Sequence, residues 1–179
     1  MNVIFLDFDG VIDTVHLNNN DDIEKKIKIL AKACEKYDCK VVIEASMKDA
    51  MDEETMETES KWLKNILYLF KKYNIDCIGR TPNVIKRISK ISYIPIWKED
   101  EIRLYLFRHP EIQHYCIIDD DDLGPINSDL NKVKNHLVKT LDYSNNFEEE
   151  GLLESHIDEI GNVLKKDNEI RKLALKRKN

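Results

Sequence analysis

The feature that most constrains the fold is a continuous apolar run near the start of the chain, Val3-Ile4-Phe5-Leu6. A strand with one solvated face alternates apolar and polar residues, whereas a run without polar interruptions is typical of a strand buried on both faces. Short apolar runs at 41–43 and 115–118, and the largely apolar segments 75–78 and 136–138, are also read as strands. Strands of this kind occur mostly in parallel sheets that helices cover on both sides.

Segments with helical periodicity separate these runs. Apolar residues recur in steps of three and four through 23–34, 62–73, 102–106 and 153–164, which places them on one face of a helix. Strands that alternate with helices predict an α/β fold in three layers, with a mostly parallel five-stranded sheet and helices on both faces. A length of 179 residues with 42% hydrophobic residues suits one such domain.

The composition restricts location and partners. No apolar stretch reaches the roughly 20 residues of a membrane helix, and the N-terminal run lacks the basic region of a signal peptide. The 4 cysteines form no C-x-x-C pair, which favours buried free thiols over a disulfide framework or a zinc site. We therefore expect a soluble cytoplasmic protein without a membrane partner, and no motif identifies a protein partner.

The charge is distributed unevenly. The whole chain has a net charge of −6, whereas residues 165–179 carry seven Lys or Arg against two Asp or Glu. Because no aromatic residue is interleaved there, a solvated helix explains this segment better than a nucleic-acid patch. We predict one domain over residues 1–165, followed by a basic C-terminal helix or tail at 166–179.

Carboxylates follow two of the apolar runs. Asp7 and Asp9 come directly after the first run, and strand alternation points both to the same side. Asp119-Asp120-Asp121-Asp122 follows the run at 115–118. An acidic turn or a solvated loop would explain either group alone, but the carboxyl ends of parallel strands share one edge, where ligand sites lie. Together they predict a Mg²⁺ site, because Mg²⁺ prefers oxygen ligands. The candidate metal ligands are Asp7, Asp9, Asp119 and Asp120.

The motifs in their order along the chain resemble the haloacid dehalogenase (HAD) superfamily. They are Asp7-Phe8-Asp9-Gly10-Val11, a hydroxyl at Ser46, Gly79-Arg80-Thr81-Pro82, Lys98-Glu99-Asp100-Glu101-Ile102, Ile117-Ile118-Asp119-Asp120 and Gly151-Leu152. In detail they are similar to the small capless HAD-type domains, some of which occur in RNA-repair proteins. The resemblance implies a Rossmann-like fold without a cap domain. In agreement, the segment 79–98 holds little beyond Ile85, Ile88, Ile91 and Ile94, too few core residues for a cap domain.

The resemblance also implies roles for the candidate catalytic residues. Asp7 would be the nucleophile that forms an aspartyl-phosphate, and Asp9 would act as general acid and then as general base. Ser46 would donate a hydrogen bond to the phosphate, and Lys98 would stabilise the charge that develops on its oxygens.

The same resemblance implies how the metal is held. Mg²⁺ would be bound by Asp7, the Phe8 carbonyl and Asp119, with Asp120 supporting or substituting. The metal would neutralise part of the charge that otherwise keeps a carboxylate away from a phosphate dianion.

The hydroxyl position has two possible registers. Ser46 stands at the end of the second strand, with Lys48 where relatives often have arginine, but Glu44 shares a face with Ser46. A carboxylate facing the phosphate would repel it unless it were turned away, protonated or bound to metal.

The sequence leaves two candidate functions open. The first is a Mg²⁺-dependent phosphatase for a phosphate monoester, with a nucleotide or polynucleotide end as favoured substrate. The second is a catalytically weak metal- and phosphate-binding regulatory module.

Overall fold

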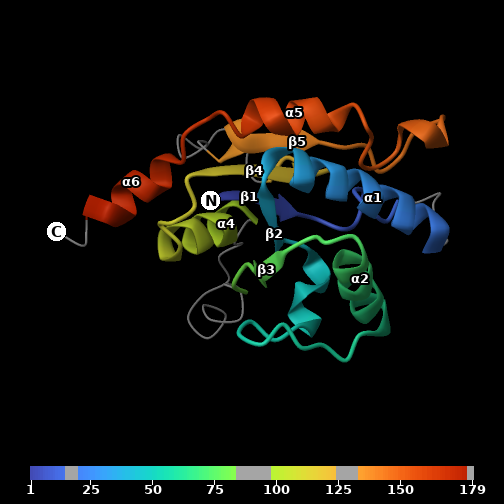
Figure 1. The fold of residues 1–179 in the computed structure, drawn as a ribbon, viewed down its shortest axis with the longest axis horizontal. Helices are drawn as coiled ribbons and strands as arrows, with labels where there is room; N and C mark the ends of the chain where they lie inside the picture. The colour runs from blue at the N-terminus through green and yellow to red at the C-terminus, as the bar shows by residue number, and fades with distance from the viewer. Residues whose placement is uncertain (15–19, 84–97, 124–132, 177–179) are drawn as a thin grey trace.

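The computed structural model describes residues 1–14, 20–83, 98–123 and 133–176. Its sheet has five parallel strands in the order β3-β2-β1-β4-β5, as Figure 1 shows. The strands are β1 (Asn2–Leu6), β2 (Cys39–Ile43), β3 (Cys77–Arg80), β4 (His114–Asp119) and β5 (Leu137–Lys139). The predicted five-stranded parallel sheet is therefore confirmed.

Helices cover both faces of the sheet. The α-helices in the described residues are α1 (Asn20–Tyr37), α2 (Lys61–Lys72), α4 (Lys98–Arg108), α5 (His156–Val163) and α6 (Glu169–Lys176). Short 3₁₀ helices are η1 (Ser46–Ala50), η2 (Lys134–His136) and η3 (Phe147–Glu149). One core layer joins the sheet to α1, α2 and α5, and the other joins it to α4 and α6. This is the three-layer, Rossmann-like α/β arrangement.

The central strand shows why the apolar runs are uninterrupted. In β1, Val3 and Phe5 belong to the layer under α4, whereas Ile4 and Leu6 belong to the layer under α1, α2 and α5. All four side chains are fully buried. Because alternate residues enter opposite layers, residues that follow the strand also divide between the two faces.

The third strand begins later than the sequence predicts. The largely apolar segment 75–78 predicts a strand there, but β3 spans Cys77–Arg80. The Ile75 N–H donates to the Phe70 carbonyl at 2.9 Å, and Asn74 has a left-handed φ of 56°. Ile75 is therefore part of the turn that ends α2, and the strand extends to Arg80 at the carboxyl edge of the sheet.

Two expectations depend on residues outside the described ranges. The segment with Ile85, Ile88, Ile91 and Ile94 lies outside them. The described residues form the sheet and its covering helices and contain no cap domain. The basic segment contains the helix α6, which begins at Glu169, while residues 177–179 are not described. Among the described helices, none combines the length and apolarity needed to cross a membrane.

Candidate active site

Three carboxylates meet at the carboxyl edge of the sheet. Asp7 directly follows β1, Asp119 ends β4, and the two strands pair with Leu6 opposite Ile118. Ligand oxygens of Asp7, Asp119 and Asp120 all lie within 4.8 Å of one another. Asp7 and Asp119 are buried and Asp120 is half-buried. The site thus joins the two acidic groups that the sequence placed at separate strand ends.

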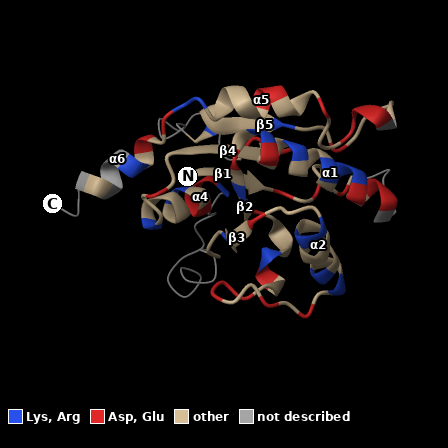
Figure 2. Cartoon of the chain, in the orientation of Figure 1, with Lys and Arg blue, Asp and Glu red and all other residues tan. Residues whose placement is uncertain are grey.

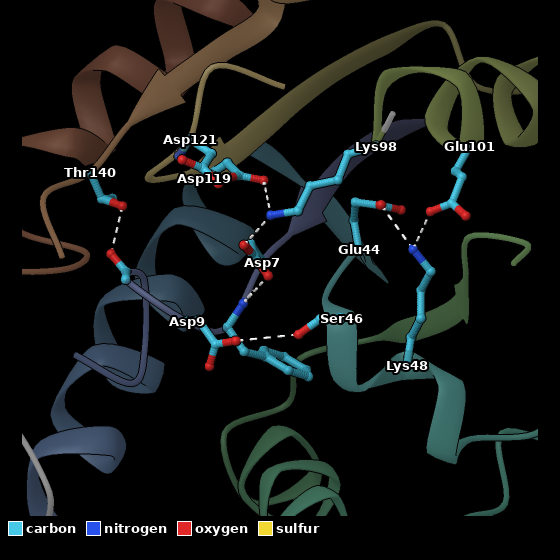
Figure 3. Close-up of polar contacts among 12 residues, drawn as sticks. Asp7, Asp9, Glu44, Ser46, Lys48, Lys98, Glu101, Asp119, Asp121 and Thr140 are labelled. Carbon is cyan, nitrogen blue, oxygen red and sulfur yellow. Dashed lines mark hydrogen bonds and ion pairs between the residues drawn. The ribbon is translucent and has the colours of Figure 1, made fainter. Parts of the chain in front are cut away.

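Lys98, the first residue of α4, reaches into this cluster. Its ammonium contacts Oδ2 of Asp7 and donates to Oδ2 of Asp119 at 2.9 Å (Figure 3). Burial lowers the pKa of Lys98, but the two carboxylates outweigh this and hold the pKa above its ordinary value. Lys98 is therefore charged at neutral pH.

The cluster carries more negative charge than Lys98 can balance. Burial first, and then the neighbouring Asp119, raise the pKa of Asp7 to about 7, against the opposing effect of Lys98. Burial also raises the pKa of Asp119 and of Asp120. A site of three converging carboxylate oxygens with excess negative charge fits a hard divalent cation such as Mg²⁺.

The backbone behind the cluster turns sharply at Gly10. The Phe8 carbonyl accepts the N–H groups of Val11, Ile12 and Asp13 at 3.2, 3.0 and 3.0 Å. This carbonyl is thus committed to the turn, and the expectation that it binds the metal is not supported by the geometry. Gly10 has a φ of +68°, and a Cβ added there would lie 2.4 Å from Cγ of Asp120.

Asp9 lies beside Ser46 rather than inside the three-carboxylate cluster. The Ser46 hydroxyl donates to Oδ2 of Asp9 at 3.3 Å, and both residues are exposed. Figure 3 shows the two side chains joined by this hydrogen bond, apart from the contacts of Lys98 with Asp7 and Asp119. Asp9 is consequently accessible to a ligand from solvent.

Glu44 is buried and takes part in a different network. It accepts hydrogen bonds from the Thr81 hydroxyl and, at 2.9 Å, from the Lys48 ammonium, which also donates to Glu101 at 2.5 Å. Burial is the largest influence on Glu44 and raises its pKa to about 7, while Lys48 and Thr81 lower it. Glu44 is buried and Ser46 is exposed, so the Ser46 hydroxyl is the group that a ligand can reach.

A stability measurement can test the ionisation of Glu44. Its folded-state pKa of about 7 exceeds the ordinary value of 4.5, so the folded protein binds more protons than the unfolded chain between these values. Stability should be lost as the pH rises through that window and stay level above it. In Glu44→Gln this contribution disappears, so urea unfolding should show a flatter pH dependence than in the wild type. The exposed Glu59→Gln is the control, and identical slopes for Glu44→Gln and wild type would contradict the assignment.

Several residues of the site carried no specific role in the sequence prediction. Thr81 and Glu101 stand in the weaker motifs, and their contact with the Glu44–Lys48 pair depends on how β3 and α4 pack. Thr140 is also new: its hydroxyl donates to the Gly10 carbonyl at 2.7 Å, and its N–H donates to the Asp119 carbonyl at 3.0 Å. A threonine after the fifth strand was the available signal, since that position lies at the same edge.

A comparison with protein families places this site in a known context. Residues 3–151 match the family described as the HAD domain in Swiss Army Knife RNA repair proteins. The chain belongs to this family. The matched region of the HAD domain contains all five strands and every candidate residue of the site, whereas α5 and α6 follow it. No curated protein and no solved structure matches the chain significantly.

Proposed function

We propose that this HAD domain is a Mg²⁺-dependent phosphatase that hydrolyses a phosphate monoester through an aspartyl-phosphate. Family membership indicates phosphatase-type chemistry. The observation that carries the proposal is the cluster of Asp7, Asp119 and Asp120 with the Lys98 ammonium directed into it.

Asp7 is the proposed nucleophile. Its Oδ1 accepts the N–H of Phe8 at 2.8 Å, which fixes the rotation of the carboxylate, while Oδ2 contacts Lys98. One oxygen of Asp7 attacks phosphorus, and the bond from phosphorus to the leaving-group oxygen breaks. Lys98 is placed to contact phosphoryl oxygens as their charge develops.

Asp9 is the proposed general acid and base. It lies two residues after the nucleophile on the exposed side of the site, where a leaving group departs toward solvent. Asp9 donates a proton to the leaving oxygen, and its carboxylate then takes a proton from the water that attacks the aspartyl-phosphate. Phosphate is released and Asp7 is regenerated. Ser46, bonded to Asp9, is placed to orient that carboxylate or to donate to the phosphate.

The proposed metal ligands are Asp7, Asp119 and Asp120, with Asp9 adjacent. When bound, Mg²⁺ supplies the positive charge that lets a carboxylate approach a phosphate dianion.

The substrate proposal rests on the family and on the charge of the segment that follows η1. RNA-repair membership favours a phosphorylated nucleotide or polynucleotide end. The segment between η1 and α2 is strongly acidic (Figure 2), with Asp52, Glu53, Glu54, Glu57 and Glu59. Such a segment repels a long polyanion, so a short phosphorylated end should be preferred over a long strand.

Removing the metal tests the proposed function. We expect hydrolysis of p-nitrophenyl phosphate in Mg²⁺, loss of turnover with EDTA, and recovery when Mg²⁺ is restored in excess. Oligonucleotides with a 3′- or a 5′-phosphate, each in short and long versions, then identify the preferred end. Absence of metal-dependent turnover across this panel would contradict the phosphatase. Mg²⁺ binding without turnover would instead favour the regulatory module, for which the carboxylate at Glu44 is the motivating observation.

A further inference from the structure

The buried ammonium of Lys48 is a charged group that the proposed mechanism does not use. Lys48 is 5% exposed, Glu44 is 0% exposed and Glu101 is 6% exposed. Figure 3 shows the ammonium between the two carboxylates, one from the end of β2 and one from α4. Lys48 itself belongs to η1. Three elements thus meet at one buried cation.

Such a network is not explained by stability alone. Burying charged groups has a desolvation cost that can exceed their mutual attraction, and apolar residues of similar volume are often as stabilising. What an ionic link adds is a defined geometry, because the ammonium must keep hydrogen bonds to both carboxylates. The elements that it joins are therefore held in one relative position.

The elements joined by Lys48 carry the catalytic groups. Glu101 lies three residues after Lys98 on α4, so both side chains leave the same face of the helix. Glu44 lies beside the nucleophile's strand, since its N–H donates to the Leu6 carbonyl at 2.8 Å. The link from Glu101 through Lys48 to Glu44 therefore connects the first turn of α4, which carries Lys98, to the end of β2, which lies beside the strand that precedes Asp7.

Other described ion pairs of α4 do not make this connection. Arg103 lies 3.9 Å from Glu99 within the helix itself, and Arg108 pairs with Glu53 at the opposite end. The contacts of Lys98 with the two aspartates, and that of Glu101 through Lys48, do tie the first turn of α4 to the sheet.

We propose that Lys48 is a positioning residue: by holding Glu101 against Glu44, it fixes the first turn of α4 and so places the Lys98 ammonium on Asp7 and Asp119. The kinetic part of this inference rests on the proposed phosphatase function. The structural part concerns only the contact between Lys98 and the two aspartates.

Kinetics of matched variants provide the first test. Lys48→Met leaves two buried carboxylates without their cation and risks misfolding, so it is paired with the triple variant Glu44→Gln/Lys48→Met/Glu101→Gln, which removes all three charges. For the triple variant we expect kcat to fall about 10- to 100-fold, the size of loss that a small misplacement of a catalytic group causes, with KM changed far less. Lys48→Arg keeps the link and should restore most of kcat. Lys40→Met, on β2 and in an exposed pair with Asp76, is the control.

Combining the triple variant with Lys98→Met shows whether its loss of kcat depends on Lys98. If Lys48 acts through Lys98, the triple variant should cause little further loss of kcat once Lys98 is replaced. Equal fold-losses in the presence and absence of Lys98 would overturn the proposal, as would a triple variant with wild-type kcat.

A readout without turnover keeps this inference separate from the proposed function. In NMR spectra of ¹⁵N-labelled lysine side chains, an ammonium held by two carboxylates is protected from proton exchange with water. We expect a Lys98 ammonium signal in the wild type, in Lys48→Arg and in Lys40→Met, and its loss or shift in the triple variant. An unchanged Lys98 signal in a folded triple variant would overturn the positioning role even if the wild type hydrolyses no phosphate ester. Absent turnover with the expected spectra would count against the phosphatase alone.

Discussion

Asp7→Asn should reduce turnover by at least about 10⁴-fold, because an amide cannot form the covalent intermediate. The substitution keeps the shape of the side chain, but its single oxygen can accept the Phe8 N–H or the Lys98 ammonium, not both. It also removes one of three carboxylates whose ligand oxygens lie within 4.8 Å of one another. Without metal, the remaining carboxylates of the cluster repel each other less than the three in the wild type do. The thermal stability of the variant should therefore not fall. Loss of activity without loss of stability separates a chemical role from a structural one.

The measurement is single-turnover hydrolysis together with thermal unfolding in EDTA. Asp122→Asn is the matched control: it stands in the same acidic run as Asp119 but is exposed and pairs with Lys139 at 2.7 Å. We expect Asp122→Asn to retain turnover. If Asp7→Asn kept a tenth or more of wild-type activity, another residue would have to be the nucleophile. Trapping of labelled phosphate on wild-type protein, absent from the variant, would locate the intermediate.

The parts of the site that the sequence predicted are those set by local pattern. Uninterrupted apolar runs identify strands buried on both faces, and parallel strands must bring Asp7 and Asp119 to one edge. The contact of Lys98 with both aspartates agrees with the position given by the resemblance. These features need only side-chain alternation, which is local, and the rule that parallel strands end at one edge of their sheet.

The remainder depends on how distant elements pack. Whether Glu44 or Ser46 faces the open site could not be decided from alternation, because both follow the same strand on the same side. The structure separates them because Thr81 and Lys48 bond the buried Glu44, while Ser46 reaches Asp9. Likewise, hydrogen bonds to the Phe8 carbonyl depend on the conformation of the turn, which its sequence alone does not specify.

The buried position of Glu44 explains why a carboxylate next to the site need not oppose phosphate binding. A carboxylate oriented toward the phosphate would oppose binding, but here its charge is balanced by Lys48 within the protein. The presence of Glu44 at this position is thus compatible with phosphate hydrolysis. The electrostatic cost of the carboxylate falls on folding rather than on substrate binding.

Gly10→Ala should weaken Mg²⁺ binding about 10- to 100-fold, as is typical when a group supporting metal ligands is disturbed. An alanine Cβ at this position would lie 2.4 Å from Cγ and 2.6 Å from Cβ of Asp120. Since both atoms belong to the short, inflexible part of the side chain, Asp120 must leave its place beside Asp7 and Asp119. The left-handed φ of +68° adds a backbone cost of about 1–2 kcal/mol for a residue with a side chain. Turnover should fall with the metal affinity.

Gly151→Ala separates the metal effect from the backbone effect. Gly151 has a similar φ of +64°, but an added Cβ would meet the Val11 carbonyl and Thr14 rather than a carboxylate of the cluster. Both variants should lose stability in urea unfolding, whereas calorimetric titration with Mg²⁺ should show a large loss of affinity only for Gly10→Ala. Asp120→Gly supplies the coupling test: it removes both Cβ and Cγ of Asp120, so in its background Gly10→Ala should cost less stability than in the wild type. Equal costs in both backgrounds would show that the glycine is required for backbone conformation alone, and that Asp120 does not depend on it.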